Sequence, residues 1–135
     1  MSGFSDYAEK KIIDHVFKTA SFTAATNLYV ALSKSTLADT ATGTTLPGEV
    51  TGGSYARKKC NTWDASSATG GDTENSQVVT FTTATAAWGT VKTFAICDKT
   101  TLGNVLVWGS LSASKVIASG DTAKFATAAI DITLA

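Results

Sequence analysis

The sequence contains few of the side chains with which enzymes and metal sites are built. It has one histidine, His15, and its eleven acidic residues are spread along 135 residues without a recognisable pair. A histidine-based metal site needs further ligands, and glycoside hydrolysis needs two carboxylates flanking one bond. His15 lies among charged neighbours on the polar side of a predicted helix, which indicates a solvated or capping role. We therefore expect a protein that is not an enzyme and binds no cofactor.

An excess of basic charge is also missing. Eleven lysines and arginines balance eleven acidic residues, and charged residues make up only 16% of the chain. A sequence-independent nucleic-acid binder needs a surplus of positive charge to displace counterions from phosphates, so no nucleic-acid partner is expected. The one basic cluster, Arg57, Lys58 and Lys59, lacks an aromatic stacking array and favours an exposed strand edge or a subunit contact.

Long apolar runs and cysteine motifs are absent as well. No run approaches the roughly 20 residues that span a bilayer, and the polar N-terminus does not resemble a secretory leader, so neither a membrane partner nor export is expected. Cys60 and Cys97 form no CxxC motif. Two reduced, partly buried thiols and a disulfide between neighbouring strands both stay open. The carboxylates at Asp98, Asp121 and Asp131 do not form a calcium-binding DxDxDG loop.

What is abundant is threonine, alanine, serine and glycine, with threonine concentrated where strand patterns occur. β-branched residues suit a pleated sheet, so the bias predicts a mainly β fold. Residues 90–97 and 104–111 flank a polar connector ending in glycine, which predicts an antiparallel hairpin. Alternation places Val91 with Thr93, Ala95 and Cys97 on one face. Because both faces of the hairpin are largely apolar, it is expected to be central and covered on each side.

One amphipathic helix is predicted, over residues 4–18. Ser5 or Asp6 can cap it, and Asp6 as the cap would place Glu9 in a capping box. Its apolar stripe is expected to dock, either on the protein's own sheet or on a neighbouring subunit. The stripe consists of Ala8, Ile12, Ile13, Val16 and Phe17.

The remaining pattern predicts one domain, 1–135, in which residues 27–134 form a β-sandwich or jelly-roll-like barrel of about seven strands. Residues 27–33 read as a half-buried strand with Ala31 and Ser33 facing out. Residues 34–53 and 61–76 are expected to be long loops, the first either a flexible surface loop or an interaction arm. Trp88 is expected to pack its ring against the core at a turn. The other predicted strands are 54–60, 77–82, 122–126 and 129–134, the last with Ile130, Ile132 and Leu134 inward.

Several stretches in collinear order resemble a family of small proteins of tailed bacteriophages, labelled tail-fibre-like proteins or capsid cement (decoration) proteins. The stretches are FSDYAEKKIIDHVF at 4–17, LYVALS at 28–33, GGSYARK at 52–58, TATAAWGTVKTFAICD at 83–98, GNVLVWGSL at 103–111 and SGDTAKF at 119–125. The FSDYAE and AWGTV segments are the more distinctive. The resemblance implies a non-enzymatic structural protein of the virion, assembled in the host cytoplasm, with a β-sandwich body.

Within that family, we expect a capsid cement protein on the outer head surface that bridges major capsid subunits and also associates with itself as a dimer or trimer. The alternative is a tail-fibre or tail-associated module that binds a receptor or glycan, for which Trp63 with Asp64 is the best aromatic and acidic pair. The residues expected to make subunit contacts are Phe4, Tyr7, Leu46, Pro47, Tyr55, Arg57 and Lys59.

Overall fold

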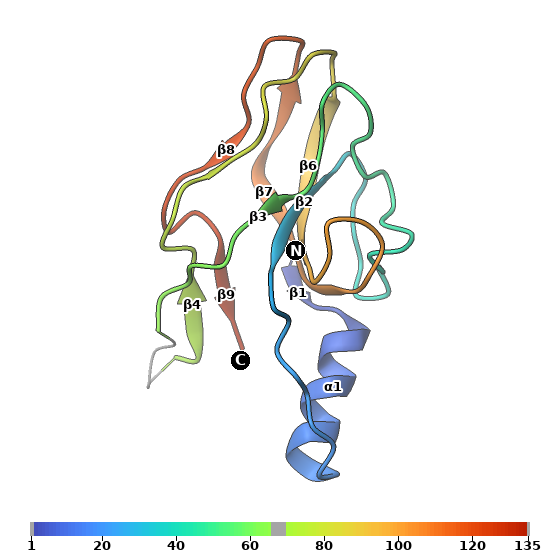
Figure 1. The fold of residues 1–135 in the computed structure, drawn as a ribbon, viewed down its shortest axis with the longest axis vertical. Helices are drawn as coiled ribbons and strands as arrows, with labels where there is room; N and C mark the ends of the chain where they lie inside the picture. Colours follow the sequence, from blue (N-terminus) through green and yellow to red (C-terminus); the bar gives the residue numbers. More distant parts are fainter. Residues whose placement is uncertain (1, 66–69, 135) are drawn as a thin grey trace.

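The computed structural model describes residues 2–65 and 70–134, which contain one helix and nine strands (Figure 1). The helix is α1 (Asp6–Phe17). The strands are β1 (Ser2–Phe4), β2 (Tyr29–Ser33), β3 (Lys58–Lys59), β4 (Asp72–Glu74), β5 (Val79–Thr80), β6 (Gly89–Cys97), β7 (Val105–Ile117), β8 (Lys124–Phe125) and β9 (Asp131–Thr133).

The predicted hairpin is confirmed as β6 and β7, and it forms the middle of an antiparallel sheet with strand order β1-β7-β6-β2-β3. Two smaller antiparallel ribbons, β4–β9 and β5–β8, complete the strand structure. The fold is therefore mainly β and sandwich-like, as predicted. Within the described ranges the sheets do not close into a barrel.

Two of the nine strands were not predicted. β1 is the tripeptide Ser-Gly-Phe, which pairs with β7 at Val107–Gly109, and β4 lies within the expected loop 61–76. Neither has an alternating apolar pattern, so only pairing with a distant strand defines them. Residues 66–69 of that loop lie outside the described part of the chain.

Both faces of the main sheet are covered, as the apolar character of the hairpin predicted. On one face a core cluster that includes Val30, Ile96 and Val107 packs against residues of the two ribbons. On the other face a smaller cluster joins Ala95 and Trp108 to the segment 34–50. The members of this smaller cluster are Ala31, Leu37, Ala41, Leu46, Ala95, Cys97, Val105 and Trp108.

Trp88 fills the turn that leads into β6, in agreement with the prediction. Its ring is 2% exposed, and its Nε1–H donates to the Gly53 carbonyl oxygen at 2.9 Å. The Tyr55 ring meets it edge-on at 5.3 Å between centroids. Gly53 has φ +55°, and a Cβ there would lie 2.8 Å from the Ala86 oxygen, so the close approach of this turn requires glycine.

The prediction that β2 is half-buried is wrong, because Ala31 and Ser33 are fully buried together with the residues on the other face. The segment 34–50 folds back over this side of the sheet and is held there by backbone hydrogen bonds. Lys34 N–H donates to the Gly48 oxygen at 2.9 Å, and Val50 N–H to the Leu32 oxygen at 3.0 Å. The segment was expected to be a surface loop or an arm. It is instead a packed layer of the protein.

The predicted face of Val91 is also wrong. The pairing of β6 with β7 shifts between Val91, opposite Lys115, and Thr93, opposite Ser110. This bulge leaves four residues of β7, from Leu111 to Ser114, opposite Lys92 alone. Because β7 has three residues more than β6 here, and three is an odd number, the alternation of side chains along β6 is reversed across the bulge. Val91 therefore joins the core on the ribbon side, whereas Thr93 points to the segment 34–50 and donates to the Ser35 oxygen at 2.7 Å.

A smaller correction concerns the last strand. Ile130 is fully buried and Ile132 partly so, but Leu134 is 55% exposed. β9 ends at Thr133, and only the backbone of Leu134 is held, through its N–H to the Gly71 oxygen at 3.0 Å.

Candidate docking surfaces

In the described residues, helix α1 is hydrogen-bonded to the body through its first turn. Ser5 caps it: the Ser5 Oγ accepts the Ala8 N–H at 3.2 Å and donates to the Val105 carbonyl oxygen of β7. The Ser5 N–H donates to the Leu106 oxygen at 3.0 Å. Ser5 and Ala8 are buried. Because Ser5 rather than Asp6 is the cap, Glu9 lies one position too late for the capping box.

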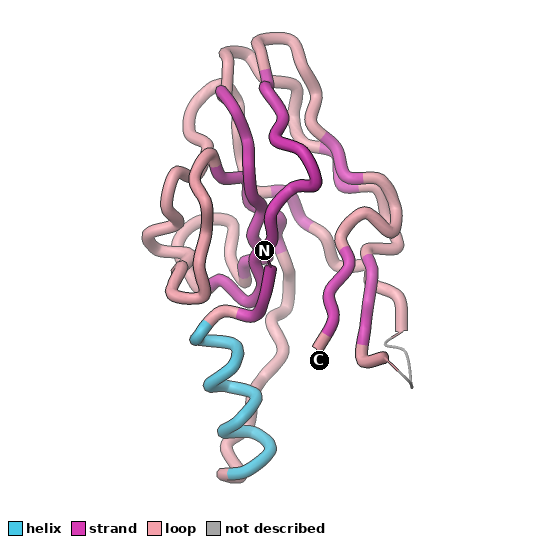
Figure 2. The backbone as a smooth tube through the Cα atoms, turned by 180° about the vertical axis from the view of Figure 1, so that it is seen from behind, coloured by secondary structure: helices cyan, strands magenta, loops and turns pink. Residues whose placement is uncertain are grey.

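Beyond the first turn the helix projects from one end of the body, and the chain after it runs back alongside (Figures 1 and 2). The apolar stripe that was expected to dock is largely uncovered there: Ile13 is 51% exposed, Val16 62% and Phe17 75%. We call these three residues the helix stripe. They lie at i, i+3 and i+4, so they form one surface on one side of the helix.

Several polar residues of α1 and of the turn after it pair with one another. Lys10 and Lys18 both pair with Asp14, and these hydrogen bonds hold the pKa of the Asp14 carboxyl below its ordinary value. His15 is exposed, and its Nδ1 accepts the Phe22 N–H at 3.3 Å from the chain that follows the helix. Such pairs orient the helix surface, although exposed ion pairs stabilise little.

A small apolar cavity lies between α1 and the β4–β9 ribbon. Its volume is about 250 Å³, and its walls include Ala8 and Ile12 of the helix, Phe4 of β1 and Ile132 of β9. Phe4 is half-buried and packs on the main core. Tyr7 is half-buried too, and its ring meets Phe22 edge-on at 6.4 Å between centroids. The cavity continues the apolar surface from the helix onto the body.

A second cluster, near the start of α1, is built around a buried arginine. Arg57 is 7% exposed, and its Nε–H and Nη2–H donate to the two carboxylate oxygens of Glu49 at 2.7 and 2.8 Å. Its remaining hydrogen bonds reach the carbonyl oxygens of Gly43 at 2.8 Å, Leu102 at 2.8 Å and Lys99 at 3.1 Å. One guanidinium thus ties the segment 34–50 to the connector of the β6–β7 hairpin.

This arrangement overturns the expectation that Arg57 is part of an exposed basic cluster. The sequence signal that could have found it is Glu49, because a buried arginine requires a carboxylate partner and both residues flank the same glycine-rich turn. Tyr55 joins the cluster: it accepts the Leu32 N–H at 2.9 Å and donates to Glu49 Oε1 at 3.3 Å, and burial raises the pKa of its phenol.

The seven residues expected to make subunit contacts are not brought together. Leu46 and Arg57 are interior, and Tyr55 packs between Phe81 and Trp88, so these side chains belong to the protein's own core. Pro47 and Lys59 are exposed, on different elements. For them and for the half-buried Phe4 and Tyr7, subunit contact stays a prediction.

The aromatic residue proposed for glycan binding, Trp63, packs in part on the protein's own core. Trp63 is half-buried and packs on the main core, with its Nε1–H donating to the Cys60 oxygen at 3.1 Å. Trp63 also lines the cavity beside α1, and glycan binding at Trp63 with Asp64 stays a prediction.

The two cysteines are buried in the core, and two of the acidic residues considered for calcium, Asp98 and Asp121, accept hydrogen bonds that hold turns. Cys60 and Cys97 are both free and buried, and burial raises the pKa of each thiol, that of Cys97 to about 11. Asp98 accepts two hydrogen bonds from Asn104 at 2.7 Å and closes the hairpin connector. Asp121 accepts the Ala118 N–H at 2.8 Å in the turn before β8. In residues 2–65 and 70–134, no three metal-ligating side chains form a cluster, and no helix is long and apolar enough to cross a bilayer.

Comparison with known proteins identifies the family to which the chain belongs. The family model described as podophage GP4 fiber I protein gp80 matches residues 3–133, nearly the whole chain. No curated protein matches the chain. The resemblance noted in the sequence is confirmed at the level of phage structural proteins, which are components of the virion. The chain therefore belongs to the family of the podophage GP4 fiber I protein gp80 and is a bacteriophage structural protein.

Proposed function

We propose that the protein is a non-enzymatic structural subunit of a podophage fibre, held in the particle by the helix stripe. The family description names a fibre protein, which favours this location over the head. The observation that carries the mode of attachment is the exposure of Ile13, Val16 and Phe17 on a helix that projects from the body.

The physical argument concerns the cost of exposed apolar surface. Burying a side chain of this kind stabilises by roughly 1.5–3 kcal/mol, and contiguous exposed apolar patches usually mark binding surfaces. The stripe lies beside the apolar cavity lined by Ile12 and Phe4, so a partner could cover helix and body together. Many copies bound at such modest interfaces stabilise an assembled particle through multivalency.

The fold limits which part of a fibre the protein can form. In the part of the chain that is described, the single helix has 12 residues, and the strands belong to one sheet and two ribbons. A shaft requires a long coiled coil or a repeated unit that stacks on itself. The protein therefore suits a junction or attachment piece.

A capsid cement protein that binds the major capsid protein is the second candidate. The same compact body with a projecting apolar helix would suit attachment to the outer surface of a shell. The fibre is preferred on the family description alone.

The location is tested by imaging purified virions with an antibody against this chain and by cryo-electron microscopy. Labelling at the tail with density for the fold in the fibre would support the fibre subunit. An icosahedral array on the head would replace it by the cement role. Absence of the chain from purified particles would overturn both.

The attachment surface is tested with the double variant I13S/F17S and the matched control V78S, since Val78 is as exposed as Ile13 at 51%. We expect the double variant to fold normally and to be lost from virions assembled in its presence, whereas V78S is incorporated. Normal incorporation of I13S/F17S would rule out the helix stripe as the anchor.

A further inference from the structure

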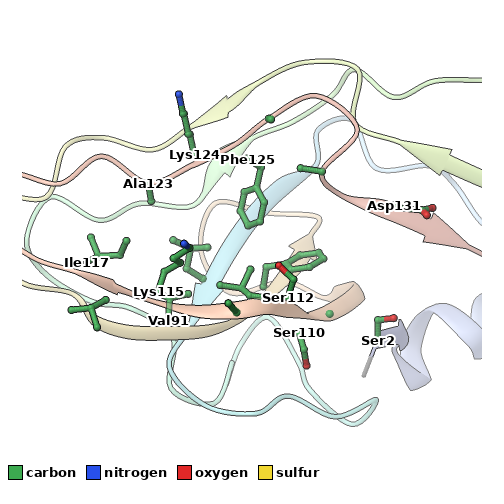
Figure 3. A pocket seen from close by; sticks show the side chains of 18 of the residues that line it. Ser2, Val91, Ser110, Ser112, Lys115, Ile117, Ala123, Lys124, Phe125 and Asp131 are labelled. Atoms are coloured by element: carbon green, nitrogen blue, oxygen red, sulfur yellow. The ribbon is translucent and has the colours of Figure 1, made fainter.

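A second, larger surface lies on the opposite side of the sheet from the segment 34–50. It is a groove of about 670 Å³ between β7 and the strap that carries β8 and leads to β9 (Figure 3). Its floor is apolar, with Leu32 of β2, Phe94 of β6 and Phe125 of β8. The function proposed above makes no use of this groove.

One wall of the groove is a strand with an open edge. β7 is paired with β6 on one side, but on the other side β1 reaches only as far as Gly109. In the described part of the chain no strand lies along the edge of β7 from Leu111 to Val116. Residues 112–116 are exposed, and Val116 is 70% exposed. An uncovered edge of this length invites pairing with another strand.

The two ends of the groove have opposite charge. Lys115 and Lys124 lie toward one end and Asp131 toward the other, as Figure 3 shows. All three are exposed, and none forms an ion pair with another residue of the described ranges. The groove therefore presents a basic end and an acidic end along the direction of β7.

We propose that two copies of this chain associate across a two-fold axis through this groove, with β7 of one copy antiparallel to β7 of the other. A two-fold axis at Ala113, the middle of the segment from Leu111 to Lys115, reverses the groove end for end. It brings the lysines of each copy to Asp131 of its partner, so the charge pattern is self-complementary. An isologous contact of this kind closes on itself as a dimer.

The sequence at the centre of this contact suits the pairing. Ser112, Ala113 and Ser114 are small, so two edges can approach closely. In a register centred on Ala113, Lys115 lies opposite Leu111 of the partner rather than opposite the other Lys115, which avoids like charges at directly opposed positions. The formal net charge of zero means that two copies do not repel one another at long range.

The dimer is tested first by its oligomeric state and by cysteine cross-linking. Sedimentation of the purified chain over a range of concentrations is expected to show a monomer–dimer equilibrium. Ala113→Cys is expected to form an intermolecular disulfide, because a residue on the axis lies within disulfide reach of its own copy. Ala24→Cys, exposed before β2, is the matched control and is expected to cross-link little; Cys60 and Cys97 are buried.

Reversing the charges at the ends of the groove tests whether the two copies contact each other through it. Asp131→Lys is expected to weaken the dimer about tenfold, because attraction at both ends becomes repulsion. The triple variant K115D/K124D/D131K restores opposite ends and is expected to regain the affinity of the natural chain.

A chain that stays monomeric at all concentrations, with no Ala113→Cys cross-link, would overturn the proposal. So would a dimer that is unaffected by Asp131→Lys, or a cross-link in virions that joins Ala113→Cys to a different protein. These outcomes are independent of where the chain lies in the virion, so this proposal and the fibre proposal can fail separately.

Discussion

The segment 34–50 and helix α1 each differ from what their sequences predict, and they differ in opposite directions: the segment is more buried than predicted, and the helix is more exposed. The segment is rich in threonine, alanine and glycine and reads as a loop, yet it buries Leu37, Ala41 and Leu46 and is tied down by Arg57. The helix is amphipathic and reads as a docking element, yet it leaves the helix stripe exposed. The comparison teaches that the apolar residues of the segment 34–50 are covered because hydrogen bonds hold this segment on the sheet, whereas no other part of the described chain is held over the helix stripe.

The largest expected effect comes from removing that frame. Arg57→Ala leaves the Glu49 carboxylate and three carbonyl groups without their donor, and breaking a buried ion pair from one side costs about 3–5 kcal/mol. We expect the free energy of unfolding, measured by chemical denaturation, to fall by this amount. Lys59→Ala, two residues away and exposed, is the control and should change it by less than about 0.5 kcal/mol. Equal, small effects would mean that the segment is not held by Arg57.

The next effect concerns the apolar residues of the same segment. Leu37 is 2% exposed, so Leu37→Ala removes buried methyl groups and leaves a cavity in the smaller core cluster. A cost of about 2–4 kcal/mol is expected in the same denaturation experiment. A cost below about 0.5 kcal/mol would show that the segment is a loosely attached loop, as its composition suggests.

The third effect is a dependence of stability on pH at the covered face. Cys97 lies in the smaller core cluster, and its folded pKa of about 11 exceeds the ordinary value of 9.0 because burial disfavours the thiolate. A raised folded pKa stabilises fully below pH 9 and loses that contribution as the pH rises toward 11. The loss amounts to on the order of 2 kcal/mol.

We expect melting temperatures to fall between pH 9 and pH 11, with Tyr55 acting in the same direction because its pKa is also raised. Cys97→Ala should fall less steeply than the natural chain over this interval, and an identical slope would argue against the burial of this thiol.

The smallest effect on stability is expected on the helix. Phe17 is 75% exposed, so Phe17→Ser should change the free energy of unfolding by less than about 0.5 kcal/mol. Circular dichroism during denaturation measures it directly. A loss above 1 kcal/mol would mean that the ring packs on its own chain, and the contrast with Leu37 would disappear.

The sequence by itself determined the parts of the molecule that depend on local periodicity. The 3.6-residue spacing of Ala8 and Ile12 predicts α1, and the two β-branched runs around a glycine-ended connector predict the β6–β7 hairpin. The sequence also predicts the position of Trp88 at the turn, because burying a ring of that size against the core is strongly stabilising, and Trp88 is indeed 2% exposed. Phage family membership was likewise visible in collinear motifs.

Only the tertiary structure decided which surfaces are covered. The bulge opposite Lys92, the pairing of β1 with β7 and the Arg57–Glu49 cluster each join residues far apart in sequence, which no local pattern encodes. The segment 34–50 is part of the body, and Arg57 is interior rather than on the predicted surface. Its guanidinium donates hydrogen bonds to five oxygen atoms, which satisfies its charge and its N–H groups away from water. Exposure is a property of the neighbours that folding brings together, and periodicity contains no information about those neighbours.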